Sequence, residues 1–422
     1  MIGRFGSRRI WLGLVGGLFL AVGLWLFVSG GWNRRDPLER GLECVENADA
    51  DGVDRIEHEL NRAGRKDEAT VLRCAWLTRR GRYGEVLRRL PPEMIDGPQR
   101  RHVLQLAGES LFHLGDFDKA ELLLVRSTVE FPDEVAAHRL LAAMYYDLGA
   151  NNLALRELAE VQRLAPLDYR PHQLAGMIHA DGEDFAKAID QLRQALDRNP
   201  PGETRAAIQV ELARALTRNR EYQAAVDLLT ADGEFADRAA PDRSAILAEC
   251  YWSLGERDRA MTLVDAILQS DSRNTAALRL KSRLLEERGQ VDGALTALRQ
   301  VLAAEPYDVE SRYQLVQLLG VRGLLEERDR EQQEYQRYRA LQEQLVKFNL
   351  QASDEPDAVA PRRELVRICQ ELGRHQLAEM WQRAVAYCEK RERLRKSVDR
   401  VAPAEAVDAG DDTSPRRATN SR

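Results

Sequence analysis

Apolar residues recur at helical spacing along most of the chain, and the pattern is clearest in residues 101–134. The first half of this stretch carries an apolar residue or pair on every turn, at Val103, Leu104, Leu106, Ala107 and Leu111. Gly115 and Asp116 interrupt the series. A second apolar series follows, at Phe117, Ala120, Leu123 and Leu124. It stops before Pro132, because proline disfavours helical backbone in the preceding residue. The stretch therefore predicts two helices joined by a tight turn.

This hairpin pattern returns with a period of 34 residues, lengthened slightly in two places. The seven copies begin at Asp67, Arg101, Val135, Tyr169, Ala206, Pro241 and Thr275. Their eighth position is always small, as Cys74, Gly108, Ala142, Gly176, Ala213, Ala248 and Ser282. Their twentieth position is Val86 and then alanine, at Ala120, Ala154, Ala188, Ala225, Ala260 and Ala294. The fifteenth position is glycine in five copies and is occupied by Glu183 and Arg220 in the other two. Small residues at two fixed positions indicate that the two helices of each hairpin approach closely.

The small eighth residue, the Gly-Asp-aromatic turn at residues 115–117, Ala120 and Pro132 resemble the tetratricopeptide repeat. The resemblance covers residues 67–308. It implies an all-α fold, a right-handed superhelix (an α-solenoid) of paired helices whose concave groove binds a peptide or a partner protein. The residues support this fold independently. One hairpin is too small to bury its own apolar face, so successive hairpins are expected to stack on a shared core.

The N-terminal segment adds one element of a different kind. Residues 10–28 form a run of 19 residues without a charge. As a helix this run spans about 28 Å, close to the thickness of the apolar core of a bilayer. Trp11, Trp25 and Trp32 lie towards its ends, where indole rings favour the membrane interface. We expect a transmembrane helix that serves as an uncleaved signal anchor, preceded by a basic tail at residues 1–9. A cleaved signal peptide, which would leave a secreted soluble protein, is the alternative.

The sequence indicates less clearly on which side of the membrane the repeats lie. Arginines flank the apolar run almost evenly, at positions 4, 8 and 9 before it and 34, 35 and 40 after it. An early anchor with a short basic tail usually keeps that tail in the cytoplasm. We therefore expect a single-pass protein of the bacterial inner membrane with its repeats in the periplasm. Five scattered cysteines fit a reducing compartment better and leave a cytoplasmic orientation open. Gly13 and Gly17 have the spacing that lets two transmembrane helices pack closely, which suggests a homodimer.

The segments around the seven repeats carry weaker forms of the same pattern. Residues 33–66 are predicted to form a degenerate first repeat that caps the stack. Residues 309–352 are predicted to form a divergent repeat and a long capping helix, and residues 353–361 a linker. Residues 362–400 again have a hairpin pattern. Residues 401–422 contain too few apolar side chains to fold and are expected to be disordered.

The resemblance also implies which residues line the groove, since the first helix of each repeat presents positions 2, 5, 9, 12 and 13 to it. The candidates are His102, Gln105, Phe112, Arg139, Tyr146, Arg170, Gln173 and Trp252. The same positions of later repeats include Arg214 and Arg218. The alternative is that these residues are solvated helix faces or contacts between adjacent repeats. The Lys and Asn of chaperone-binding repeats, at positions 5 and 9, are replaced here by pairs such as Gln105 and Glu109, which disfavours a cochaperone role of that type.

Composition and motifs narrow the function further. The chain has 62 basic and 68 acidic residues, a net charge of −6, which argues against nucleic-acid binding. It contains no C-x-x-C, H-E-x-x-H, phosphate-loop or G-x-S-x-G motif, so we expect no metal, no cofactor and no enzymatic activity. The sequence predicts a membrane-anchored scaffold or adaptor for protein–protein interactions, with a role in envelope assembly or secretion. The alternative is a catalytic or accessory subunit that acts through the divergent C-terminal third.

Overall fold

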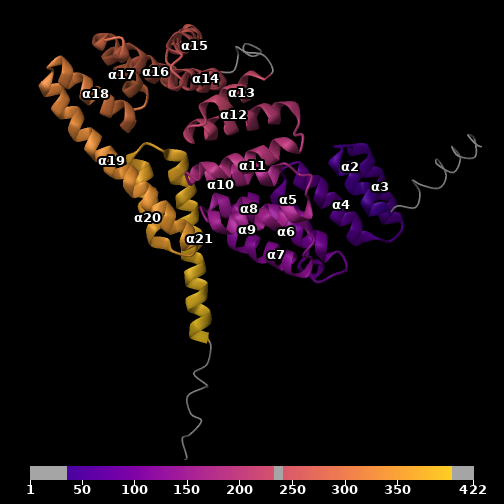
Figure 1. The fold of residues 1–422 in the computed structure, drawn as a ribbon. Helices are drawn as coiled ribbons and strands as arrows, with labels where there is room; N and C mark the ends of the chain where they lie inside the picture. Colours follow the sequence, from indigo (N-terminus) through magenta and orange to yellow (C-terminus); the bar gives the residue numbers. More distant parts are fainter. Residues whose placement is uncertain (1–35, 232–240, 402–422) are drawn as a thin grey trace, which may run out of the picture. The chain divides into compact units, whose positions relative to one another are not determined.

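The computed structural model describes residues 36–231 and 241–401, and every regular element within them is a helix. Consecutive helices pair as antiparallel hairpins, and the hairpins stack (Figure 1). Contacts divide the chain into two units, Met1–Leu141 and Ala142–Arg422, with the boundary inside one helix, α8. The two units are described separately below. The expected stack of paired helices is confirmed.

The first unit contains the helices before that boundary. They are α2 (Pro37–Glu46), α3 (Ala50–Arg62), α4 (Lys66–Arg79), α5 (Tyr83–Arg89), the 3₁₀ helix η2 (Pro92–Ile95), α6 (Arg100–His113), α7 (Phe117–Glu130) and the start of α8 (Val135–Asp147). The segment predicted to be a degenerate first repeat forms the α2–α3 hairpin. Val53 and Leu60 of α3 are fully buried in the same cluster as the residues of α4 and α6, so this hairpin shares the core of the repeats.

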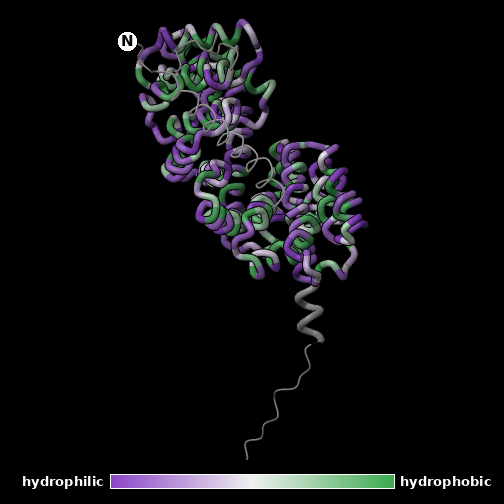
Figure 2. The backbone as a smooth tube through the Cα atoms, turned by 90° about the vertical axis from the view of Figure 1, so that its right-hand side faces the viewer, coloured by the Kyte–Doolittle hydropathy of each residue, from purple (hydrophilic) through white to green (hydrophobic). Residues whose placement is uncertain are grey.

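The second unit continues the stack and ends in longer helices. After α8 come α9 (Asn151–Leu164), α10 (Arg170–Asp181), α11 (Phe185–Asp197), α12 (Gly202–Arg218), α13 (Tyr222–Thr230), α14 (Pro241–Ser253), α15 (Arg257–Ser270), α16 (Thr275–Glu287), α17 (Val291–Ala304), α18 (Val309–Arg322), α19 (Leu325–Asp354), α20 (Val359–Glu371) and α21 (His375–Val401). One buried cluster runs from Ala188 to Leu284 across several hairpins. Each helix alternates apolar and polar positions along its length, as expected for a helix with one buried face (Figure 2).

Close approach of the two helices explains the small residues at the eighth position. A Cβ atom at Gly108 would lie 2.7 Å from the Leu124 side chain, and one at Gly176 would lie 2.7 Å from Leu192. Ala120 and Ala188, on the opposing helices, have no exposed surface. In these hairpins a leucine side chain of the second helix therefore fills the space that a side chain at the glycine would occupy.

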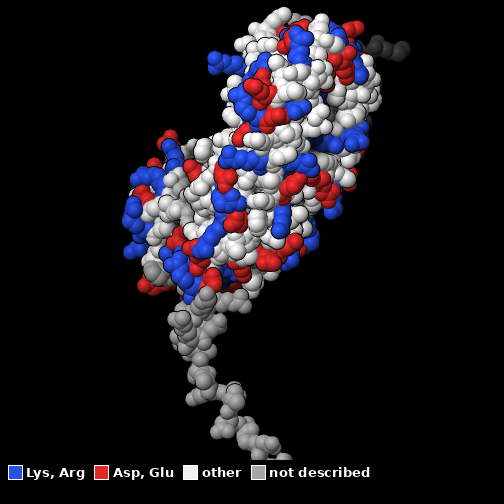
Figure 3. All heavy atoms as spheres, turned by 90° about the vertical axis from the view of Figure 1, so that its left-hand side faces the viewer, with Lys and Arg blue, Asp and Glu red and all other residues white. Residues whose placement is uncertain are grey.

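Ion pairs link successive repeats on the surface. Arg257 pairs with Glu287 at 2.9 Å, and Arg299 pairs with Glu327 at 3.0 Å. Acidic and basic side chains are interspersed on the face displayed in Figure 3. Each exposed pair contributes little to stability. Together they favour one rotational setting between neighbouring hairpins, since each donor has its acceptor about one repeat further along.

The C-terminal helices depart from the expected boundaries. Helix α19 continues to Asp354 and α20 begins at Val359, so only residues 355–358 of the predicted linker 353–361 lie between helices. Arg362, which is fully buried, closes this turn. Its guanidinium donates to the backbone oxygens of Ala352 at 2.9 Å, Glu355 at 3.0 Å and Ala358 at 2.8 Å. A cation at the carboxyl end of a helix interacts favourably with the helix dipole, so one arginine both caps α19 and orients α20.

Several N- and C-terminal expectations lie outside the described residues. These are the transmembrane helix at residues 10–28, its Gly13 and Gly17 pair, and nearly all of the 401–422 tail. Between residues 36 and 401, in the parts of the chain that the structure describes, no helix is both long and apolar enough to cross a bilayer.

Arg220→Gly is expected to stabilise the fold. Arg220 takes the place of the turn glycine and adopts φ 63°, a left-handed conformation that is strained for a residue with a Cβ atom. The gain in the free energy of unfolding should be roughly 0.5–1 kcal/mol, measured by chemical denaturation. Arg220→Ala is the matched control, because it removes the side chain but keeps the strain. Equal stabilities of the two variants would contradict this explanation.

Gly176→Leu is expected to destabilise the fold by about 1–3 kcal/mol, because the new side chain would overlap Leu192. Gly202→Leu serves as the control, since a Cβ atom there meets no atom within 4 Å. Thermal unfolding of both variants checks the prediction. If the two midpoints fall equally, then helix contact at position 8 is not the cause.

Candidate functional site

The first helices of two consecutive repeats, α10 and α12, form the walls of a cavity of about 760 Å³. We call it the groove pocket. Its lining includes Met177, Asp181, Phe185, Val210, Glu211, Arg214, Arg218, Asp242 and Arg243. Met177, Asp181, Arg214 and Arg218 occupy positions that the sequence assigns to the groove. The pocket combines an apolar surface with carboxylates and guanidinium groups, and its volume lies in the range usual for ligand sites.

A second cavity, of about 500 Å³, lies between the α8–α9 turn and the C-terminal helices. We call it the hairpin pocket. It is lined by Tyr146 and Gly149 on one side and by Leu345, Val346, Leu377, Met380 and Trp381 on the other. Asp181, Glu183 and Arg218 line both cavities, so the two pockets adjoin. The C-terminal helices therefore cover part of the repeat surface next to the groove pocket.

Tyr146 and Asp181 form the clearest polar contact between two predicted groove positions. The Tyr146 hydroxyl donates to Asp181 Oδ2 at 3.0 Å. Burial raises the pKa of Tyr146, and the negative charge of Asp181 adds to the rise. Desolvation also raises the pKa of the Asp181 carboxyl, while the hydrogen bond from Tyr146 opposes it. The carboxylate thus has a neutral donor and no cationic partner.

Gln173 and Glu211 form a similar pair one repeat further along. Burial raises the pKa of Glu211, and a hydrogen bond from Gln173 and the charge of Arg214 act in the opposite direction. Glu211 Oε2 is buried without a hydrogen-bond partner among the described residues. A donor on a ligand would satisfy this oxygen. Gln173 thus bonds to a residue of the pocket lining without lining the pocket itself, and its role in the groove stays a prediction.

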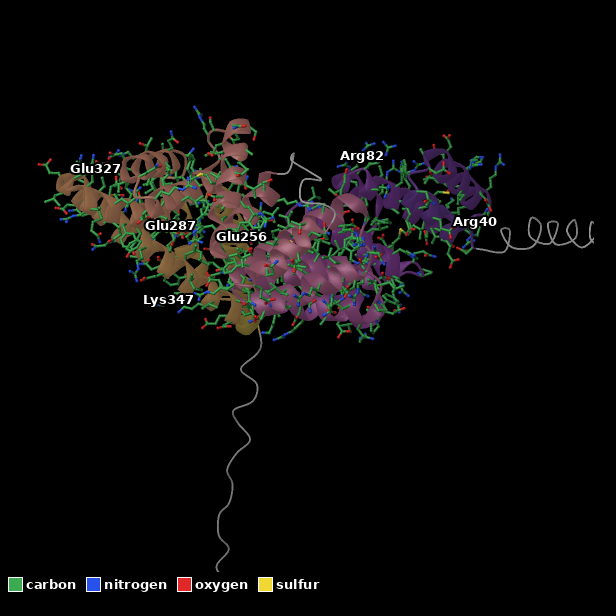
Figure 4. The ribbon with its side chains drawn as sticks, turned by 45° about the horizontal axis from the view of Figure 1, so that its top comes forward. Arg40, Arg82, Glu256, Glu287, Glu327 and Lys347 are labelled. Carbon is green, nitrogen blue, oxygen red and sulfur yellow. The ribbon has the colours of Figure 1, made fainter. Side chains whose placement is uncertain are left out.

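Trp252 and Arg170 have local partners instead. The Trp252 Nε1–H donates to the carboxylate of Glu287 at 2.9 Å, and Arg257 pairs with the same carboxylate. Glu287 is labelled in Figure 4. The Arg283 guanidinium lies 5.1 Å from the centre of the indole ring. Trp252 therefore contacts the adjacent repeat through repeat positions 12 and 13, the same positions that Tyr146 and Asp181 occupy. Arg170 is exposed and pairs with Asp168 at 2.8 Å, two residues away in its own turn.

The remaining candidates lie on the first helices of earlier repeats. His102, Gln105 and Phe112 are half-buried on α6. Burial lowers the pKa of His102, and the Phe112 ring lies 5.9 Å from that of Phe117. Arg139 is half-buried on α8, on the same side of that helix as Tyr146, about two turns earlier. For these four residues the groove assignment stays a prediction.

The repeat pattern did not reveal that Trp381 of α21 contacts the α8–α9 turn. Trp381 is 3% exposed and packs directly on Gly149, whose φ of 64° makes the α8–α9 turn. A Cβ atom at Gly149 would overlap the indole. Asn152 of α9 donates to the backbone oxygen of Ser353 at 3.3 Å, which fixes the end of α19 nearby. The sequence gives little indication of this contact, because Trp381 occupies an ordinary apolar position of a helical hairpin and Gly149 is more than 200 residues away.

Comparison with known proteins gives the class of the repeats. The tetratricopeptide repeat model matches residues 106–169, 174–241 and 246–313, and these segments are tetratricopeptide repeats. The chain is similar to the DnaJ homolog subfamily C member 3 of Gallus gallus, with 25% identity over 259 residues. That similarity covers 58% of this chain and 50% of the relative, so the chain spans about half the relative's length.

Solved structures of other repeat proteins resemble the chain at low identity. The C-terminal part of a repeat protein from Cytophaga hutchinsonii has a TM-score of 0.46 and 12% identity, covering 57% of this chain and 97% of that one. Pseudomonas aeruginosa pilF has a TM-score of 0.40 and 18% identity, covering 50% and 95%. A tetratricopeptide protein with an unusual peptide-binding site, YrrB, has a TM-score of 0.37 and 15% identity, covering 45% and 96%.

Trp381→Ala is expected to loosen the C-terminal hairpin from the α8–α9 turn. Truncation of a buried indole lowers the free energy of unfolding by about 3–5 kcal/mol. Here the lost packing is that between α21 and the α8–α9 turn. Amide hydrogen exchange should rise in residues 145–155 and in α20–α21, and remain unchanged in α14–α16. Trp381→Phe is the control, because it keeps the packing, and the indole N–H that it removes has no partner in the described chain. Unchanged exchange in residues 145–155 would contradict the assignment.

Proposed function

We propose that the chain is a membrane-anchored scaffold that captures a protein or peptide ligand in the concave groove of its tetratricopeptide repeats. The observation that carries this proposal is the groove pocket between α10 and α12. It lies on the first helices of consecutive repeats, which are the helices that the family resemblance assigns to ligand binding. Glu211 Oε2, which has no hydrogen-bond partner among the described residues, could accept a hydrogen bond from a peptide N–H group. Met177 and Val210 provide an apolar surface for a peptide side chain.

The anchor in this proposal is the uncharged run at residues 10–28. Its length and terminal tryptophans support insertion in the bacterial inner membrane. We further propose that the repeats lie in the periplasm, where the scaffold would assist envelope assembly or secretion. Confinement to a membrane raises the local concentration of a ligand that shares that membrane, so a modest affinity in the groove suffices. The Gly13 and Gly17 spacing supports a homodimer through the anchor.

The scaffold is proposed to act without catalysis. The sequence contains none of the catalytic motifs considered above, which supports this, and two carboxylates of the groove pocket, Asp181 and Glu211, accept hydrogen bonds from Tyr146 and Gln173. Among residues 36–231 and 241–401 no group of three or more His, Cys, Asp or Glu side chains is placed to hold a metal ion. Binding alone is therefore the activity to be tested.

A photoreactive residue at position 177 tests the groove assignment in native membranes. Met177 lines the groove pocket, so we expect irradiation to yield a discrete crosslinked protein. The control is the same photoreactive residue at Arg156, an exposed position of α9 that does not line either pocket. A discrete product at both positions, or at neither, would show that the concave surface is not the binding surface.

Protease added to intact spheroplasts tests on which side of the membrane the repeats lie. A periplasmic repeat domain should be digested from outside, while a cytoplasmic one should survive until the membrane is lysed. Replacing Leu18 and Leu20 with arginine should move the chain out of the membrane fraction, because each charge at the bilayer centre costs roughly 3 kcal/mol. Retention of that variant in the membrane would exclude residues 10–28 as the anchor.

A further inference from the structure

Two arginines in the groove pocket lack a partner. Arg214 and Arg218 are one helical turn apart on α12, and both are exposed and line the pocket. The described residues provide neither of them with a hydrogen bond or an ion pair. Glu211 attracts Arg214 electrostatically without bonding to it. Side chains at this spacing point from the same side of a helix, so both guanidinium groups can reach a single ligand.

This situation differs from that of arginines elsewhere in the same unit. Arg257 and Arg299 each have a carboxylate of the next repeat within 3.0 Å, and Arg279 has one of its own repeat at 2.9 Å. Two carboxylates of the pocket lining are instead engaged by neutral donors, Asp181 by Tyr146 and Glu211 by Gln173. Arg214 and Arg218 therefore offer a ligand five guanidinium N–H donors each.

A ligand that covers these arginines must supply acceptors. A guanidinium that loses water without gaining an acceptor pays a desolvation cost, whereas a carboxylate can bind it through two parallel hydrogen bonds. Asp181 and Glu211, which also line the pocket, already accept hydrogen bonds from Tyr146 and Gln173. Glu183 and Asp242 also line the pocket, so a basic ligand is the competing possibility.

The apolar part of the pocket adds a second requirement. Met177, Phe185 and Val210 lie in the same lining, and an apolar ligand side chain would cover them. We propose that the groove pocket binds a peptide segment in which an acidic side chain lies close to an apolar one, with the carboxylate on Arg214 and Arg218. This inference rests on the proposed peptide-binding function and names the chemistry of the ligand. The two arginines are at positions 9 and 13 of their repeat, so Arg214 takes the Asn position of chaperone-binding repeats, while Arg218 is at neither the Lys nor the Asn position.

The test is selection from a random peptide display library on the full-length chain in nanodiscs, with empty nanodiscs as the background. We expect the retained peptides to be enriched in Asp or Glu near an apolar residue. Replacing the acid of a selected peptide by its amide should weaken binding roughly tenfold or more, as measured by fluorescence anisotropy. Raising the salt concentration should also weaken binding, because exposed charges are screened.

The matched variants are two double substitutions that remove the same charge. Arg214→Gln with Arg218→Gln should lower the affinity for the selected peptides by roughly tenfold or more. Arg62→Gln with Arg156→Gln removes two exposed arginines on α3 and α9 and should leave the affinity unchanged. All four positions are on the surface, and circular dichroism melts confirm that both proteins fold.

The outcomes separate this inference from the function on which it rests. Neutral or basic peptides that bind the wild type and crosslink to position 177 would overturn the acidic ligand but keep the peptide-binding groove. Equal affinity of the two double variants for acidic peptides would also overturn it. If no peptide is enriched over empty nanodiscs, both this inference and the proposed groove function fail.

Discussion

The structure depends on one packing constraint, the close contact of two helices that are too short to bury their apolar faces alone. Gly108 against Leu124 and Gly176 against Leu192 bring the helices of a hairpin together without room for a Cβ atom. Each hairpin then leaves an apolar face for its neighbour, and the buried cluster from Ala188 to Leu284 is the result. A stack built in this way has contacts mainly between neighbours, so its grooves are formed by side chains from consecutive repeats.

The groove pocket follows from that construction. Helices α10 and α12 are equivalent elements of two adjacent repeats, and their equivalent positions converge on one cavity. Hydrogen bonds within the groove, such as Tyr146 to Asp181, use residues one repeat apart. The same spacing explains the surface ion pairs. What distinguishes the pocket is that two of its cationic groups have not been paired in this way, which leaves a surface with a chemical preference.

The C-terminal hairpin is the exception to contacts between neighbours. Arg362 joins α19 to α20 through three backbone oxygens, and Trp381 places α21 on the α8–α9 turn. This contact brings α19 and α21 next to repeat residues that also line the groove pocket, including Asp181 and Arg218. Ligand access and the position of the hairpin are consequently linked by shared side chains. The divergence of this segment from the repeat pattern is consistent with its different packing partners.

The sequence alone determined the repeat, the turn positions and the identity of the helices that line the groove, because these depend on local spacing and on residues at most one repeat apart. It even marked Glu183 and Arg220 as exceptions at a turn where the structure has positive φ values. Only the tertiary structure decided which groove positions are available. Trp252 is engaged by Glu287, Tyr146 lies beside the C-terminal helices, and Arg214 and Arg218 have no partner among the residues that the structure describes. Periodicity assigns a side chain to a face of a helix. Whether that side chain finds a partner depends on neighbours that the period does not specify, and on contacts such as Gly149 with Trp381 that span more than half of the chain.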